Sequence, residues 1–292
     1  MEKAMSNKEQ FFFPKSDVPL RSVQLVELDI LKAVDKICRK YNIPYMLYGG
    51  TMLGAIRHRG FIPWDDDIDI CMLRNDYERF LEIASHELPD HLVLSNYKYE
   101  KYSTLMFTKV RHLDSLFAHP ANLDSPVHHG IFIDIFPLDS LQSNYRKSKK
   151  QMLKSNRQFI IVSSLDKNRC KYSSSIKNSL MRLFIYYFTK IIPKARIFKR
   201  AERVFQQFNA TNTDFVTSFT NGGTPDAIDR IKIERSSFSD LVDMTFENHL
   251  FLMPRNYDEI LRRFYGDYMK YPPIENRQPL HGVSDIRLPK GY

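Results

Sequence analysis

Three aspartates alternate with other residues along one short stretch of the chain, at Asp65, Asp67 and Asp69. Side chains of a β-strand alternate between its two faces, so a strand here would place all three carboxylates on one face. Carboxylates this close repel one another, and a divalent cation that prefers oxygen ligands, Mg²⁺ or Mn²⁺, would stabilise them. The alternative is a loop with solvated charges, which is common for an isolated Asp-x-Asp pair.

A further aspartate, Asp134, lies within the run of large apolar residues 131–136, which is typical of a buried strand. Pro137 is expected to end this strand, and Asp139 to cap the turn after it. A buried, ionised carboxylate is costly unless it is paired or bound to a metal. Asp134 is therefore either a third acid of the same site or a structural aspartate bonded to backbone amides.

Gly49, Gly50 and Thr51 lie at the predicted boundary between a strand at 45–48 and a short helix. Glycines let the backbone approach a ligand closely, and a helix N-terminus offers amides to phosphate. We expect Thr51 to cap this helix. Together with the aspartates, this is what a nucleotidyltransferase-type site needs: carboxylates for metal ions, a glycine turn for phosphate, and a remaining carboxylate to bridge a metal or take the nucleophile's proton.

The stretch 48–70 strongly resembles the signature of the LicD family, which is similar to fukutin and belongs to the nucleotidyltransferase-fold superfamily. Residues 133–139 match as well, as do residues 265–269 and, later, His281. The resemblance is dense over residues 20–140 and patchy over residues 245–281, and the basic segment between them matches no recognisable family. Tyr265, Asp267 and His281 match family positions to which the sequence assigns no role.

The resemblance implies that Asp67, Asp69 and Asp134 are the catalytic and metal-binding carboxylates, with Asp65 as a further candidate. Members typically transfer a phospho-alcohol group, often phosphocholine, from a CDP-linked donor to a glycan hydroxyl. For this chain it implies a phosphotransferase that uses Mg²⁺ or Mn²⁺ and CDP-choline and releases CMP. The acceptor would be a precursor, commonly lipid-linked, of a cell-surface glycan such as teichoic acid or lipopolysaccharide.

Several basic and aromatic residues could support this chemistry. Lys109 and Arg111 are two apart on a predicted strand and could bind the donor's phosphates, or could be exposed strand charges. The basic residues 57–59, predicted to form a loop, could hold the leaving CMP or the acceptor, and solvation explains them equally well. Trp64 could contact choline by a cation–π interaction, although core packing is the simpler explanation.

The mixture of predicted strands and helices indicates an α+β or α/β core. The family resemblance implies an α+β fold with a nucleotidyltransferase-like mixed sheet core flanked by helices. The predicted divisions are a flexible tail at 1–17, a catalytic core at 18–140, a basic helical segment at 141–205 and a C-terminal subdomain at 206–292 that completes the active-site cleft. The other predicted elements are a helix at 18–41, a strand at 67–72, a helix at 75–85, a strand at 104–110, two or three helices within 141–205 and a helix at 257–264.

The net charge of +9 is unevenly distributed. Residues 141–205 hold 17 Lys and Arg but only Asp166 and Glu202, a balance of +15, so the rest of the chain carries −6. A basic, aromatic-rich segment favours contact with a polyanion, and an anionic membrane surface would suit a lipid-linked acceptor. A helical subdomain with solvated lysines explains it equally well.

Other classes of protein fit less well. A glycosyltransferase would place a longer nucleotide-binding region before its Asp-x-Asp, and a phosphatase using aspartate would need Thr where this chain has Cys71. A nucleic-acid-binding protein would not need aligned acids, and the basic segment has no RNA-binding motif. Three dispersed cysteines argue against disulfides or a zinc site. Without a signal-like or membrane-spanning stretch, we expect a cytoplasmic protein, peripheral on the membrane if the basic segment binds it.

Overall fold

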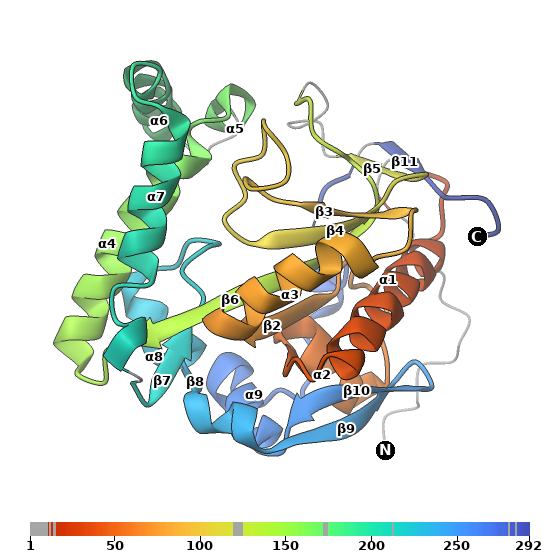
Figure 1. Cartoon of the computed structure of the whole chain (residues 1–292). Helices are drawn as coiled ribbons and strands as arrows, with labels where there is room; N and C mark the ends of the chain where they lie inside the picture. Colours follow the sequence, from red (N-terminus) through yellow and green to blue (C-terminus); the bar gives the residue numbers. More distant parts are fainter. Residues whose placement is uncertain are drawn as a thin grey trace.

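The computed structural model describes residues 11, 13, 16–118, 125–171, 175–211, 213–279, 281–283 and 285–292. Its centre is a mixed sheet with the strand order β1-β2-β6-β4-β3, flanked by helices (Figure 1), so the predicted α+β class is confirmed. The elements are α1 (Leu20–Lys40), β1 (Met46–Leu47), α2 (Gly49–His58), β2 (Asp69–Leu73), α3 (Arg74–Glu87), β3 (Leu92–Ser95), β4 (Thr108–His112), β5 (Leu116–Ala118), β6 (Phe132–Leu141), α4 (Tyr145–Ser163), α5 (Lys167–Lys171), α6 (Ile176–Thr189), α7 (Lys194–Phe205), β7 (Phe215–Thr217), α8 (Ile228–Ile231), β8 (Ile233–Glu234), β9 (Leu241–Phe246), β10 (His249–Pro254), α9 (Tyr257–Tyr265) and β11 (Asp285–Arg287).

The long strand β6 organises the sheet. It pairs in parallel with β2 on one side and antiparallel with β4 on the other, and its final residues pair with β7. Pro137 does not end the strand as predicted. It falls between the residues paired with β4 and those paired with β7, where a strand tolerates a residue without an amide hydrogen.

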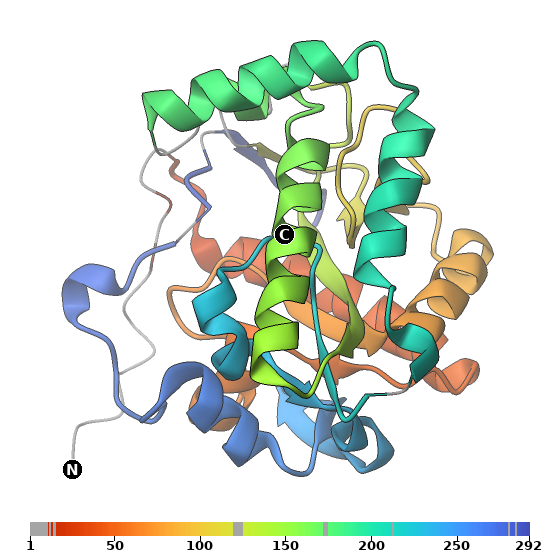
Figure 2. The same ribbon diagram turned by 90° about the vertical axis from the view of Figure 1, so that its left-hand side faces the viewer.

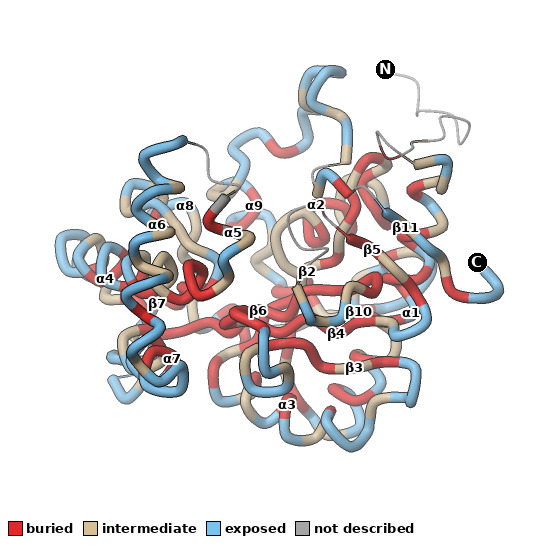
Figure 3. The backbone as a smooth tube through the Cα atoms, turned by 90° about the horizontal axis from the view of Figure 1, so that it is seen from above, coloured by how far each residue is buried: buried red, intermediate tan, exposed pale blue. Residues whose placement is uncertain are grey.

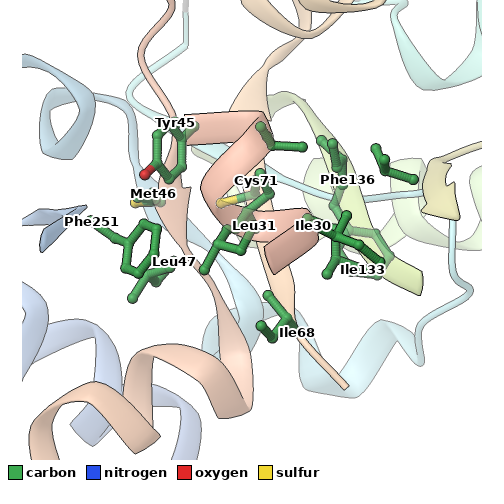
Figure 4. Close-up of a cluster of buried hydrophobic side chains, with 14 of the residues drawn as sticks. Ile30, Leu31, Tyr45, Met46, Leu47, Ile68, Cys71, Ile133, Phe136 and Phe251 are labelled. Carbon is green, nitrogen blue, oxygen red and sulfur yellow. The ribbon is translucent and has the colours of Figure 1, made fainter. Parts of the chain in front are cut away.

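Helices α1 and α3 pack together against one face of the sheet (Figure 1). The apolar residues of β4 and β6 that face them, Val110, Ile133 and Ile135, are fully buried. Figure 4 shows Ile30 and Leu31 of α1 in this core, with Ile68 and Ile133. Because strand side chains alternate, the residues between these apolar ones point to the opposite face, away from α1 and α3.

The C-terminal elements complete the same core. β9 and β10 form an antiparallel hairpin, β10 contacts β1, and α9 contacts α2. Phe246, Phe251 and Ile260 are buried in the cluster that includes α1 and the sheet, and Figure 4 shows Phe251 beside Leu47. The C-terminal part therefore packs directly on the elements that carry the aspartates.

The basic segment folds as α4, α5, α6 and α7, so the prediction of two or three helices was too low. The additional element, α5, begins after Asp166, whose side chain accepts a hydrogen bond from the amide of Asn168 (2.9 Å). Pro193 precedes α7. Residues of α4 and α7 form a second, smaller core with Leu141 and Phe219. No helix in the described ranges is long and apolar enough to cross a membrane.

Some predicted boundaries were wrong. The strand expected at 104–110 begins only at Thr108. Most of the predicted tail, residues 1–17, lies outside the described residues. Phe13, which is described, is buried, with its ring centroid 5.5 Å from that of Phe117.

Candidate functional site

Strand pairing brings Asp69, Asp134 and Lys109 into one row across the sheet. Asp69 of β2 is the register partner of Asp134 of β6, which is in turn the partner of Lys109 of β4. All three point away from α1 and α3. The Lys109 ammonium donates to Asp134 Oδ1 at 2.6 Å, and both side chains are largely buried. The row therefore places two carboxylates and one cation side by side.

Asp65 and Asp67 lie just before β2, which begins at Asp69, so the strand predicted at 67–72 starts two residues late. The pairings of β2 with β1 and β6 begin only at Asp69 or later, and this explains why the preceding residues are not part of the ladder. The alternation nevertheless continues through this extended segment: Asp66 and Ile68 are buried, while Asp65 and Asp67 are partly exposed. The expectation that Asp65, Asp67 and Asp69 share a face is consistent with this pattern.

Burial and mutual repulsion raise the pKa values of these aspartates. Burial is the largest cause for Asp65, Asp67 and Asp69. For Asp65 and Asp69 the next largest cause is the charge of Asp67. The charge of Asp134 raises the pKa of Asp67, whereas His281 lowers it. Removing several carboxylates from water at close range is unfavourable without a compensating cation.

The donor set fits Mg²⁺ or Mn²⁺ by its chemistry, since it consists of closely spaced, partly or fully buried carboxylate oxygens with excess negative charge. Within the described residues, however, no group of three or more His, Cys, Asp or Glu side chains is arranged to hold a metal ion as it stands. Asp134 contacts Lys109, and Asp67 Oδ2 lies 3.8 Å from His281 Nε2. Metal binding would therefore compete with Lys109 and His281 for the carboxylates.

The start of α2 lies against the aspartates. Gly49 has a φ of +54°, and a Cβ on it would lie 3.3 Å from Asp69 Oδ2. A Cβ on Gly50 would lie 2.8 Å from Asp65 Oδ2, so only glycine fits here without a shift. Thr51 does not cap the helix as predicted. The Ncap residue is Tyr48, and Thr51 Oγ1 instead accepts a hydrogen bond from the amide of Asp69 (2.8 Å), which fixes β2 to α2.

The C-terminal part contributes two residues to the site. The backbone amide and Nδ1 of His281 both bond to the buried carboxylate of Asp66, each at 3.1 Å. Burial alone would lower the pKa of His281, but this bond and the charge of Asp67 outweigh it and raise the pKa. The Tyr265 hydroxyl lies near Gly49, and burial, followed by the charges of Asp69 and Asp65, raises its pKa.

Two cavities lie beside the aspartates. The first, which we call the strand-side cavity, has about 360 Å³ and is lined in part by Lys109, Arg111, Phe132, Asp134, Phe159 and His281. The second, the α2-side cavity, has about 510 Å³ and is lined in part by Gly50, Arg57, Trp64, Asp65, Tyr265 and Asp267. An arrangement with carboxylates between two cavities could bring two substrates together at one reacting atom.

Lys109 and Arg111, predicted as phosphate-binding residues, are both buried and line the strand-side cavity. Arg111 Nη1 donates to the carbonyl oxygen of Gly130 (2.9 Å), and both cations lie over the ring of Phe132. They are therefore not exposed strand charges. Burial lowers the pKa of Lys109 to about 8, even though the charge of Asp134 raises it.

The basic residues 57–59 do not form the predicted loop, because two of them belong to α2 and the third caps it. Arg57 and His58 belong to α2, and Arg59 is its C-cap with φ of +58°. The Arg57 guanidinium donates to the carbonyl oxygen of Tyr268 (2.9 Å) at the α2-side cavity. Trp64 is buried, and the guanidinium of Arg277 lies 5.4 Å from its ring centroid, which favours packing over a contact with choline.

Comparisons with known proteins agree with these features. A family model described as LicD/FKTN/FKRP, nucleotidyltransferase domain, matches residues 42–173. The chain is 31% identical over 273 residues to the lipopolysaccharide cholinephosphotransferase LicD of Haemophilus influenzae, an alignment covering 90% of this chain and 96% of that protein. An uncharacterised protein of Rickettsia typhi is 34% identical over 115 residues, 39% of this chain and 35% of its own length. The chain therefore belongs to the LicD family, and two aspartates of its nucleotidyltransferase domain, Asp134 and Asp65, each line one of the two cavities.

Proposed function

We propose that this protein is a phosphotransferase that moves phosphocholine from CDP-choline to a hydroxyl of a lipopolysaccharide-type glycan precursor and releases CMP, with Mg²⁺ or Mn²⁺ as cofactor. The observation that carries the proposal is the register pairing of Asp69 with Asp134, beside Asp67 and the glycine start of α2. The cholinephosphotransferase of Haemophilus influenzae, similar over nearly the whole chain, supports the choice of transferred group and acceptor.

Asp67 and Asp69 would hold the metal, and Asp134, the register partner of Asp69, would act beside them as the proton acceptor. When bound, the metal neutralises charge on the phosphoryl oxygens and on the leaving phosphate. Residues of α2 position these carboxylates. Gly49 and Gly50 have no side chain that would displace Asp69 and Asp65, and the Thr51 hydroxyl accepts a hydrogen bond from the amide of Asp69. His281 keeps Asp66 hydrogen-bonded on the buried side of the same segment.

We assign the donor to the α2-side cavity and the acceptor to the strand-side cavity. Gly50, in the first turn of α2, lines the α2-side cavity, and Arg57 adds a cation there; a helix start and a cation together suit a diphosphate. The strand-side cavity reaches the carboxylates through Asp134 and Lys109. The acceptor hydroxyl would attack the phosphorus that carries choline, and the bond from that phosphorus to the oxygen bridging to CMP would break. Asp134, held at Oδ1 by Lys109, would accept the hydroxyl proton.

Analysis of the products tests this reaction. Enzyme, CDP-choline, Mg²⁺ and a lipopolysaccharide acceptor are incubated together, and phosphorus NMR and mass spectrometry identify the products. We expect CMP and a glycan that has gained choline together with its phosphate. Release of a nucleoside diphosphate from a productive donor would instead indicate attack on a sugar carbon, as in a glycosyltransferase, and would overturn the mechanism. If CDP-choline fails while another CDP-alcohol yields CMP, the chemistry stands but the choice of choline is wrong.

Gly50→Ala tests the close approach of α2 to the aspartates. The added Cβ would lie 2.8 Å from Asp65 Oδ2, so the carboxylate must move. We expect turnover to fall roughly 10- to 100-fold while the melting temperature stays near that of the wild type, because small displacements at a reacting centre are costly. Gly54→Ala, in the same helix, is the matched comparison. Its Cβ would lie 2.4 Å from the carbonyl oxygen of Gly60, so its main effect should be on stability. Unchanged turnover in Gly50→Ala would contradict the proposed role of this contact.

A further inference from the structure

Helix α6 exposes an apolar stripe that the fold does not use. Side chains at spacings of three and four residues fall on one side of the helix and continue into the turn after it. They are between 54% and 81% exposed: Ile176, Leu180, Phe184, Tyr187, Phe188 and Ile191. Figure 3 shows most of α6 in the colour of exposed residues, in contrast to the buried strands. A contiguous apolar surface of this kind marks an interaction site.

The stripe is not needed to hold α6 in place. Thr189 is the only residue of the helix that is buried, and the small core of the helical segment is formed mainly by α4 and α7. On the side of α6 that faces the protein, Arg182 Nη1 donates to Ser163 Oγ of α4 (2.7 Å). The side of the helix with Arg182 and the buried Thr189 therefore faces the protein, and the stripe faces outward.

The surroundings of the stripe are strongly cationic. Between residues 167 and 201 the chain has ten Lys and Arg and no Asp or Glu. Lys177, Lys190 and Lys194 are exposed on or beside α6. Aromatic and aliphatic side chains bordered by lysines are typical of helices that lie in the interface of an anionic membrane.

The orientation of α6 suits this role. Figure 2 shows α6 lying across the ends of α4 and α7 at one extremity of the molecule, so the whole stripe could meet a flat surface at once. The strand-side cavity extends toward the same region, since Phe159 of α4 and Asp166, just before α5, line it together with Asp134. α5 packs against α6.

We propose that α6 docks the protein on the surface of an anionic lipid bilayer, with the stripe inserted among the lipids and Lys177 and Lys190 at the headgroups. A second copy of the chain fits the surface less well. Two such helices in contact would bring together segments that have many cations and no acids. The proposal goes beyond the proposed reaction because it concerns a surface distant from the aspartates, and its test requires no turnover.

Sedimentation with lipid vesicles tests the proposal on the full chain. We expect binding to vesicles of phosphatidylglycerol and phosphatidylcholine at low salt, weaker binding as salt rises, and little binding to phosphatidylcholine alone. Phe184→Gln/Phe188→Gln should weaken binding to anionic vesicles by roughly tenfold for each ring removed. Leu113→Gln/Leu250→Gln, which changes two exposed leucines elsewhere, should leave it unchanged.

A second pair of variants tests the charges. Lys177→Gln/Lys190→Gln should weaken binding roughly tenfold or more and flatten its salt dependence, whereas Lys36→Gln/Lys290→Gln should not. The proposal is overturned if the protein binds no vesicles, or binds neutral and anionic vesicles equally. It is also overturned if the wild type is a dimer in solution and the phenylalanine variant becomes a monomer but binds vesicles as the wild type does. A nucleic-acid partner is indicated instead if random oligonucleotides bind as tightly as anionic vesicles and the phenylalanine variant keeps both kinds of binding.

Discussion

Asp69→Asn should lower turnover about 10³-fold or more and leave the protein folded. Asparagine has nearly the shape of aspartate but lacks the negative charge that binds a divalent cation. Substituting a residue that only supports a metal ligand typically lowers activity or metal affinity tenfold to 100-fold, and substituting the ligand itself should lower activity more. The backbone bonds of Asp69 to Tyr48 and Thr51 would remain. Burial and the charge of Asp67 raise the pKa of Asp69, so removing its charge should maintain or increase the stability of the metal-free protein.

Initial rates of CMP release and thermal unfolding, each measured with and without Mn²⁺ and CDP-choline, would separate these effects. Wild-type protein should be stabilised by the metal and donor together, and Asp69→Asn should lose this stabilisation. Asp90→Asn, at an exposed position, is the matched control and should behave as the wild type does. Near-normal turnover in Asp69→Asn would contradict the assignment of Asp69 as a metal ligand.

Local periodicity was enough to predict the acidic face. The alternation of Asp65, Asp67 and Asp69 persists although the strand begins only at Asp69, because an extended chain alternates its side chains whether or not it is paired. The apolar run around Asp134 likewise identified a buried strand. Thr51 shows where the same reasoning failed: a threonine near a helix start is expected to cap it, but here its hydroxyl accepts the amide of Asp69 from another element.

Contacts between distant parts of the chain could not be predicted in this way. The bond between Lys109 and Asp134 depends on the antiparallel register of β4 with β6, which no local pattern specifies. His281 reaches Asp66 from a segment without helix or strand, 215 residues away in sequence. For His281 the family resemblance was the only signal, and it gave a position but no role.

Arg74→Met should lower the free energy of unfolding by about 3–5 kcal/mol, because it would leave a buried carboxylate without its counter-ion. Asp139, expected to cap a turn, is instead a fully buried residue of β6. The Arg74 side chain from the start of α3 donates Nε to Asp139 Oδ1 (2.9 Å) and Nη2 to Oδ2 (2.6 Å). Asn209 donates a further bond to Oδ1 (2.8 Å). The pair joins α3 to the second half of β6. In that half, beyond Pro137, β6 pairs with β7 and no longer with β4.

Denaturant unfolding of three variants would measure this pair. Arg255→Met, which breaks the exposed ion pair with Asp240, should cost less than about 1 kcal/mol. Arg74→Met/Asp139→Asn should be more stable than Arg74→Met alone, since the second substitution removes the unpaired charge and still leaves an acceptor for Asn209. Equal losses in Arg74→Met and Arg255→Met would show that burial adds nothing to the Arg74–Asp139 pair. Asp134 lies on the same strand, but at the end away from the Arg74–Asp139 pair. Arg74→Met should therefore lower turnover only in proportion to the fraction of protein that it unfolds. Asp69→Asn, in contrast, should abolish turnover in a protein that remains folded.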